Sequence, residues 1–282
     1  MPSSRPLLRR IARWAAIVAG VLVLAVLLLL HFADVGSELT PEQEARVRRF
    51  SYAAPTGQVA VIAAGVPDAP RVILVHGTPG AAADFAELLL DPPPGVELLA
   101  VDRPGFGRSE PRDALPSLRA QADALLPLLE QRGGRWPVLV GHSLGAPIVA
   151  QLAADHPDRV GGLLLLAGAL DPDLEEWHWY NRAATVLGPL LARPQLVVAV
   201  AQRPLPDQLR ALGGELARIT CPVVVVHGRR DELVPFANVD YMRRRLTGAA
   251  PLRVVELPDG DHFLPWDAVD TVRAELASLT GS

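Results

Sequence analysis

A serine between two glycines stands where one apolar run ends and a second apolar segment with a different periodicity begins. The run 138–140 leads into GHSLG at residues 141–145, and the second segment follows at once. We expect a sharp turn from a strand into a helix, which strains the backbone of Ser143 and leaves no room for side chains two residues before and after it. The pattern G-x-S-x-G in this setting is typical of a nucleophilic serine.

A serine hydroxyl is a weak nucleophile, so the chain must also supply a base and an acid that orients the base. With this serine turn in a parallel sheet, the usual chain order is serine, then Asp or Glu, then His. Asp231 comes shortly after the apolar run 221–228, and His262 follows the run 252–258. We therefore expect both at the same sheet edge as Ser143, with His262 as the base and Asp231 as the acid.

Three other carboxylates compete with Asp231 for the role of the acid. Glu232 and Asp261 are the local competitors. We expect Glu232 to be solvated and Asp261 to shape the turn before the histidine. Asp171 also follows an apolar run, so it remains an alternative acid.

Acyl transfer at a serine also needs two hydrogen-bond donors for the oxyanion. One expected donor is the backbone N–H of Leu144, at a helix start where N–H groups have no partner in the helix. The other is the N–H of Thr78, in the loop HGTPG at residues 76–80. We expect His76 to brace this loop rather than to act as a base, and the loop 102–109 to be structural.

Apolar runs alternate with helical patterns along most of the chain, which indicates an α/β fold with a parallel sheet covered on both faces. The range 171–219 interrupts this alternation with a helical pattern, and we expect it to form a short cap inserted over the carboxyl edge of the sheet. Strands are expected within 48–54, 57–65, 71–77, 96–109, 136–143, 160–170, 221–228 and 252–258. Helices are expected near 83–90 and over 117–132, 144–157 and 266–279.

The N-terminal segment is long and apolar enough to cross a membrane. Residues 14–30 carry no charged side chain, and a helix of that span is roughly 26 Å long. Arginines precede it and acidic residues follow it, so the positive-inside rule places the N-terminus in the cytoplasm and the catalytic part outside. We expect a transmembrane anchor over 1–33, a linker over 34–45 and the catalytic domain over 46–282. A cleaved signal peptide is the alternative, although no A-x-A cleavage pattern is present.

The composition argues against several kinds of partner and cofactor. The formal net charge is only −4, so nothing suggests a nucleic acid. The single cysteine, Cys221, cannot form an intramolecular disulfide. Neither a metal-ligand spacing nor a phosphate loop is present, so we expect no cofactor and no metal. The expected partners are a small-molecule acyl substrate and, through the N-terminal helix, a membrane.

The motifs HGTPG, DRPGFGRS, GHSLG, HGRRDELVP and GDHF, in this order, resemble the α/β-hydrolase fold superfamily over residues 46–282. The resemblance implies that Ser143 is the nucleophile, Asp231 the acid and His262 the base, and that 171–219 is the family's cap. Haloalkane dehalogenases and epoxide hydrolases carry aspartate in place of this serine, so both are disfavoured. Proline iminopeptidases are similar at HGTPG but usually have Trp where this chain has Leu144.

The activity that we predict is hydrolysis of a carboxylic ester through an acyl-enzyme on this triad. A thioesterase, a lipase or an aminopeptidase similar to proline iminopeptidases would use the same residues. A non-catalytic, membrane-bound scaffold on the same fold is the alternative outside enzymes. The cap and the pocket walls select the substrate, and the sequence does not specify their shape.

Overall fold

The computed structural model describes residues 14, 18, 20–23, 25, 37–175 and 204–281. The predicted anchor over 1–33 is thus described at seven positions only, and the predicted cap lies outside the described residues from 176 to 203. Within the described ranges, no helix is both long enough and apolar enough to span a bilayer.

A single sheet forms the centre of the described part of the predicted domain over 46–282. Its eight strands stand in the order β1-β2-β4-β3-β5-β6-β7-β8. The β1–β2 and β2–β4 pairs are antiparallel, whereas all pairs from β4 to β8 are parallel. This mostly parallel sheet confirms the predicted α/β class. The strands are β1 (Arg48–Ala54), β2 (Gly57–Gly65), β3 (Arg71–Val75), β4 (Glu97–Val101), β5 (Val138–His142), β6 (Gly162–Leu166), β7 (Val223–Gly228) and β8 (Leu252–Leu257).

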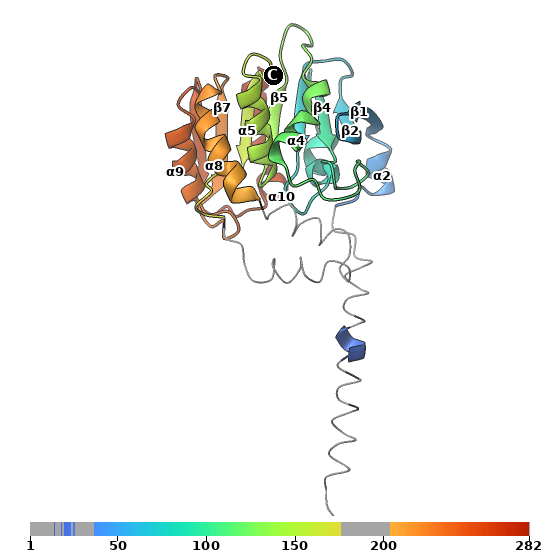
Figure 1. The fold of residues 1–282 in the computed structure, drawn as a ribbon. Helices are drawn as coiled ribbons and strands as arrows, with labels where there is room; N and C mark the ends of the chain where they lie inside the picture. Colours follow the sequence, from blue (N-terminus) through green and yellow to red (C-terminus); the bar gives the residue numbers. More distant parts are fainter. Residues whose placement is uncertain are drawn as a thin grey trace, which may run out of the picture.

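Alternate residues of the central strands face two separate apolar cores. In β3, Val72 and Leu74 pack into one core while Ile73 and Val75 pack into the other, and all four are fully buried. Burial on both faces explains why these strands are apolar throughout. One face, that of Ile73, is covered by the helices in front of the sheet in Figure 1, which are α4 (Leu118–Asp123), α5 (Gly145–Asp155), α8 (Leu205–Glu215) and α9 (Ala237–Arg245). The other face is covered by α3 (Ala86–Leu90) and α11 (Val269–Thr280).

Two helical segments differ from the prediction. The pattern over 117–132 predicts one helix, but α4 ends at Asp123 and only a 3-10 turn over Leu126–Leu128 follows. Pro127 is the reason, because it has no N–H for a helical hydrogen bond and its ring would collide with the carbonyl four residues earlier. Helix α9 is not predicted by the sequence pattern, because its apolar face is short and it ends in three arginines.

The described end of the range 171–219 is part of the domain core. Helix α8 and a 3-10 turn over Leu216–Arg218 lie in this range. The buried Leu205, Leu209 and Leu212 of α8 belong to the same apolar core as α5. This end of the range therefore covers a face of the sheet rather than its carboxyl edge.

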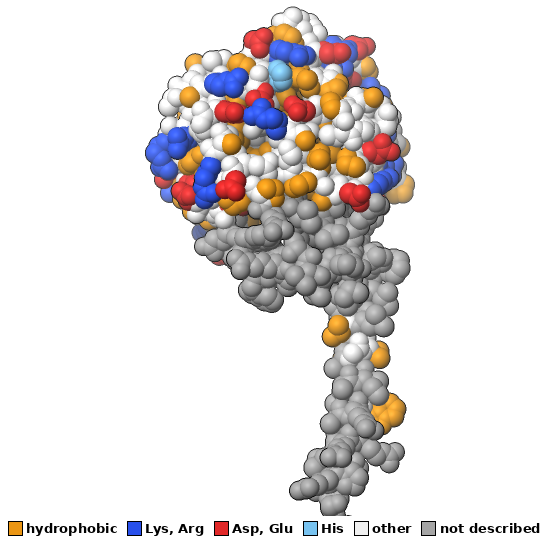
Figure 2. Space-filling model, viewed as in Figure 1, with side chains coloured by type: hydrophobic (Ala, Val, Ile, Leu, Met, Phe, Trp, Pro, Cys, Tyr) orange, Lys and Arg blue, Asp and Glu red, His pale blue; other side chains and the backbone are white. Residues whose placement is uncertain are grey.

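Charges of both signs are intermixed on the face seen in Figure 2. Ion pairs also occur on the surface, such as those that Arg119 forms with Asp155 at 2.5 Å and with Glu215 at 3.0 Å. Exposed pairs of this kind contribute little to stability, so the fold depends chiefly on its two apolar cores.

Candidate active site

Ser143 stands at the turn between β5 and α5 with a backbone φ of +53°. This left-handed conformation is costly for a residue with a side chain and is common where a functional residue is held under strain. A Cβ on Gly141 would lie 2.5 Å from the carbonyl oxygen of Gly145, and a Cβ on Gly145 would lie 2.2 Å from that of Val75. Both glycines are therefore required by close packing, as the motif predicts.

Asp231 and His262 lie together beyond the carboxyl ends of β7 and β8. The Nδ1 of His262 is 2.8 Å from Oδ2 of Asp231, and both residues are buried. The other carboxylate oxygen, Oδ1, accepts the N–H groups of Leu233 at 3.0 Å and Val234 at 2.7 Å. Because Oδ2 can only accept, Nδ1 carries the proton in this pair and Nε2 keeps a free lone pair.

The competing carboxylates have other surroundings. Glu232 is exposed, as expected for a solvated side chain. Asp261 accepts the N–H of Phe263 at 2.9 Å, so it shapes the local turn that contains His262. Asp171 accepts the N–H of Asp173 at 3.0 Å. None of these contacts involves His262, so the hydrogen bond from His262 distinguishes Asp231 from its competitors.

His142 connects the serine turn to the His262 loop, a role that the sequence does not reveal. Its Nε2 donates to the carbonyl oxygen of His262 at 2.9 Å, and the two ring centroids are 4.9 Å apart. Burial lowers the pKa of His142 to about 4, so the ring is neutral near pH 7. The only sequence signal for this residue is its position beside Ser143.

The two predicted oxyanion donors lie at neighbouring strand ends. A Cβ on Gly77 would lie 2.9 Å from the Cβ of Ser143, so the loop after β3 lies directly against the serine. In the described part of the chain, neither the N–H of Thr78 nor that of Leu144 donates to another protein group. Both N–H groups are therefore available to an acceptor from outside.

The loop over 102–109 supports the loop after β3. The carboxylate of Asp102 accepts the N–H of Ala82 at 2.8 Å and that of Arg108 at 2.9 Å. The side chain of Arg103 is 1% exposed and donates to the carbonyl oxygen of Gly77. The structural role expected for this loop agrees with these contacts, but the sequence does not single out Arg103.

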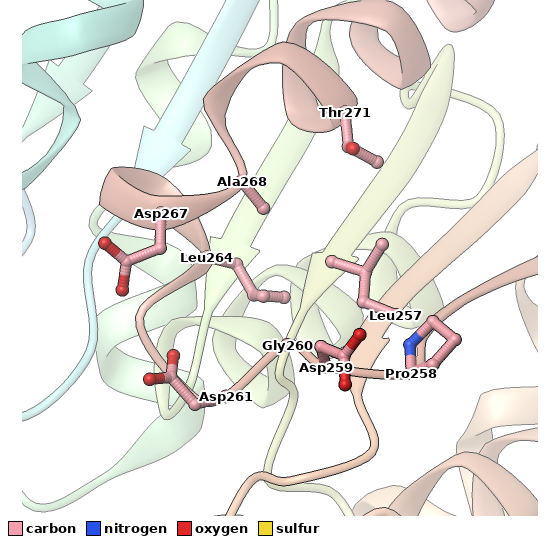
Figure 3. A pocket seen from close by; sticks show the side chains of 9 residues that line it. All are labelled: Leu257, Pro258, Asp259, Gly260, Asp261, Leu264, Asp267, Ala268 and Thr271. Carbon is pink, nitrogen blue, oxygen red and sulfur yellow. The ribbon is translucent and has the colours of Figure 1, made fainter.

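A pocket of about 410 Å³ lies beside the loop between β8 and α10 (Leu264–Asp267) (Figure 3). Figure 3 shows Leu257 and Leu264 at its centre, with Asp261 and Asp267 on the side of α10. None of the three predicted triad residues lines this pocket, although Asp261, next to His262 in sequence, does. Among the described residues, no cluster of three or more His, Cys, Asp or Glu side chains could hold a metal ion.

Comparisons with known proteins agree with this fold. A family model described as the alpha/beta hydrolase fold matches residues 70–191. A bifunctional esterase/perhydrolase of Acinetobacter calcoaceticus is 24% identical over 268 residues, which cover 77% of this chain and 94% of the relative. A pimeloyl-[acyl-carrier protein] methyl ester esterase of Neisseria meningitidis is 28% identical over 224 residues, covering 65% of this chain and 69% of the relative.

Solved structures are similar in fold at low sequence identity. A bacterial membrane phospholipase A superposes with a TM-score of 0.61 and 22% identity, covering 99% of this chain and 100% of the other.

Three further curated relatives are matched over only 26% to 54% of their own length. The chain therefore has the α/β-hydrolase fold. Its substrate is a separate question.

Proposed function

We propose that this protein is a serine hydrolase of carboxylic esters, with Ser143, His262 and Asp231 as its triad. The observation that carries the proposal is the 2.8 Å hydrogen bond between His262 and Asp231, at the same sheet edge as a serine with a φ of +53°. Asp231 and His262 are 88 and 119 positions from the serine in sequence, and His142, the residue before the serine, donates to the carbonyl oxygen of His262. A structural serine would need neither the strained turn nor the oriented histidine.

In the proposed reaction, the Oγ of Ser143 attacks the ester carbonyl carbon while Nε2 of His262 takes the hydroxyl proton. The carbonyl π electrons move to oxygen, and the N–H groups of Thr78 and Leu144 stabilise this oxyanion. When the oxyanion collapses, the C–O bond to the alcohol breaks and His262 gives its proton to the leaving oxygen. Water then attacks the acyl-enzyme by the same steps, which releases the acid and restores the serine.

Asp231 orients the imidazole and stabilises its positive charge in this mechanism. Two backbone N–H groups hold its Oδ1, so Oδ2 stays directed at Nδ1 of His262. Two relatives support an ester substrate, because an esterase/perhydrolase and a methyl ester esterase align with most of this chain's length. The same triad would act on thioesters or amides, so a substrate panel must include all three classes.

Labelling with a fluorophosphonate probe tests the nucleophile directly. We expect the wild-type protein and Ser278→Ala to be labelled, because Ser278 is an exposed serine on α11. We expect Ser143→Ala to remain unlabelled and to lose ester hydrolysis by several orders of magnitude, as triad knockouts do. Folded Ser143→Ala that is labelled or hydrolyses esters like the wild type would refute the proposal. A wild-type protein that is not labelled would favour a non-catalytic scaffold.

We further propose that residues 1–33 anchor the enzyme in a membrane, with the catalytic domain outside the cytoplasm. The described apolar side chains Val21, Leu22 and Val23 are 59–60% exposed, so they are not part of the domain core. The membrane phospholipase A that is similar over 99% of this chain adds support. In cell fractionation we expect the full-length protein in membranes after a high-salt wash, and a variant lacking residues 1–33 in the soluble fraction. A mature chain that begins near Asp34 would indicate a cleaved signal peptide.

A further inference from the structure

The Arg103 side chain is buried beneath the loop after β3. It is 1% exposed, and its three closest acceptors are neutral. Nη2 donates to the carbonyl oxygen of Gly77 at 2.5 Å and to Oγ1 of Thr78 at 2.5 Å, while Nη1 donates to Oε1 of Gln121 at 2.9 Å. No carboxylate bonds the guanidinium directly, although the charge of Asp84 acts on it and its Cζ lies 4.5 Å from the centroid of the Phe106 ring. A buried cation held by neutral acceptors is costly, so its contacts fix the groups that they bond.

His76 donates to the same carbonyl oxygen from a second direction. Its Nε2 accepts the backbone N–H of Arg103 at 3.1 Å, so the ring proton is on Nδ1. Nδ1 lies 2.8 Å from the carbonyl oxygen of Gly77 and donates to it. Burial and the nearby guanidinium of Arg103 hold the pKa of His76 well below its usual range, which keeps this tautomer neutral. Two donors therefore orient one carbonyl group.

The order of the strands determines what this orientation does. β3 lies between β4 and β5; Arg103 follows β4, the Gly77–Thr78 peptide follows β3 and Ser143 follows β5. The Gly77–Thr78 bond is trans, so its C=O and N–H groups point in opposite directions. A carbonyl held toward the β4 side places the Thr78 N–H on the β5 side. That is the side of Ser143, whose Cβ lies 2.9 Å from where a Cβ on Gly77 would stand.

We propose that Arg103, assisted by His76, is a positioning residue that holds the Gly77–Thr78 peptide with its N–H directed at the oxyanion site. The proposal rests on the proposed esterase function. A peptide turned the other way would present its carbonyl oxygen to the oxyanion and remove one of the two donors. The guanidinium also polarises the Gly77 carbonyl, which strengthens the N–H of the same peptide as a donor.

The expected effect falls on the transition state and not on substrate binding. Loss of one oxyanion donor typically costs about 10²- to 10³-fold in kcat. We therefore expect Arg103→Met to lower kcat by about 10²-fold with a KM within about twofold of the wild type, since only the charged intermediate uses the donor. Arg103→Lys keeps a cation but offers a compact head in place of the planar fork, so we expect a smaller loss.

The experiment uses 4-nitrophenyl butyrate for kcat and KM, and an aryl trifluoromethyl ketone as an inhibitor whose serine adduct carries an oxyanion. We expect the inhibition constant of the ketone to rise by the same factor by which kcat falls in Arg103→Met. Arg71→Met is the matched control, because Arg71 is a largely buried arginine at the opposite end of β3 that bonds Leu128 and Glu130. It should change the melting temperature and leave kcat and ketone affinity unchanged.

Two results would overturn the proposal: a folded Arg103→Met with wild-type kcat and ketone affinity, or a loss that appears in KM alone. If Arg103→Met does not fold, His76→Leu and His76→Asn give the same test. The leucine removes the donor to Gly77, whereas asparagine carries an amide nitrogen at the position of Nδ1 and should restore kcat. Equal activity of these two variants would also refute it. Ser143→Ala run in parallel separates this outcome from failure of the proposed function, since it tests the nucleophile alone.

Discussion

Replacing Asp231 by asparagine changes one atom of the candidate triad and keeps its shape. The Asp231 side chain is fully buried, with Oδ1 bound to two backbone N–H groups and Oδ2 to Nδ1 of His262. Only an oxygen can accept those two N–H groups, so the amide oxygen takes the place of Oδ1. The NH₂ group of the asparagine then faces Nδ1 of His262.

The consequence for catalysis follows from the proton on the imidazole. An NH₂ donor facing Nδ1 requires an unprotonated Nδ1, so the ring proton moves to Nε2 and the base is lost. In a serine protease triad the corresponding change lowers kcat by about 10⁴-fold, which equals about 5 kcal/mol of activation free energy. The fold keeps the same hydrogen-bonding positions, so we expect the urea midpoint of Asp231→Asn to stay close to that of the wild type.

The assay is steady-state hydrolysis of 4-nitrophenyl butyrate, with urea unfolding of each variant. Asp171→Asn and Asp261→Asn are matched controls, because both carboxylates follow strands near the site but accept a nearby backbone N–H. We expect both to keep kcat within a few-fold of the wild type. A folded Asp231→Asn with more than a tenth of wild-type activity would refute the assignment of the acid. A 10³-fold loss in Asp171→Asn would transfer that role to Asp171.

Three further predictions concern stability and packing. The pKa of His142 in the folded protein is about 4, below the ordinary value of about 6.5, so the unfolded chain binds a proton at a higher pH than the folded one. This residue should therefore lower the free energy of unfolding by about 3 kcal/mol as the pH falls from 6.5 to 4. Urea unfolding of His142→Gln should show a smaller loss of stability over this range, and a pH dependence equal to that of the wild type would contradict the argument. Gly145→Ala would place a Cβ 2.2 Å from the carbonyl oxygen of Val75 in β3 and should lower the free energy of unfolding by more than about 2 kcal/mol. Gly214→Ala is the control: its Cβ would stand in open space on α8, so the free energy of unfolding should rise by about 0.5–1 kcal/mol. Equal effects of the two substitutions would refute the packing argument. Gly77→Ala would place a Cβ 2.9 Å from the Cβ of Ser143 and should lower kcat even where the melting temperature changes little. A wild-type kcat in this variant would contradict the close packing of Gly77 against Ser143.

Local patterns in the sequence were sufficient to predict most elements of the sheet. A strand buried on both faces is apolar at every position whichever strand stands beside it, so β3, β5, β6 and β7 could be located without their neighbours. The glycines around Ser143 are likewise a local requirement of one sharp turn. α9 was missed because its residues show a short apolar face, and its position depends on packing against the core.

The candidate triad was predictable because its members have a fixed chain order and each follows a strand. Parallel strands place their carboxyl ends at one edge, so Ser143, Asp231 and His262 were expected there before any contact was known. What the order does not specify is which groups orient them. His142 bonds a carbonyl oxygen 120 residues away, and Arg103 bonds one 26 residues earlier.

The roles of Arg103 and His142 were decided by the tertiary structure alone. Arg103 reaches Gly77 because β4 is the neighbour of β3. The proposed direction of the Thr78 N–H toward the serine depends on β5 being the neighbour on the other side. Neither residue belongs to a motif with a recognisable spacing, and the residue type alone does not show whether an arginine is buried or exposed. The sequence by itself determined the strands, the serine turn and the order of the catalytic candidates, because these depend on local periodicity and backbone geometry. The positioning contacts depend on which strands become neighbours, and that is settled only when the whole sheet assembles.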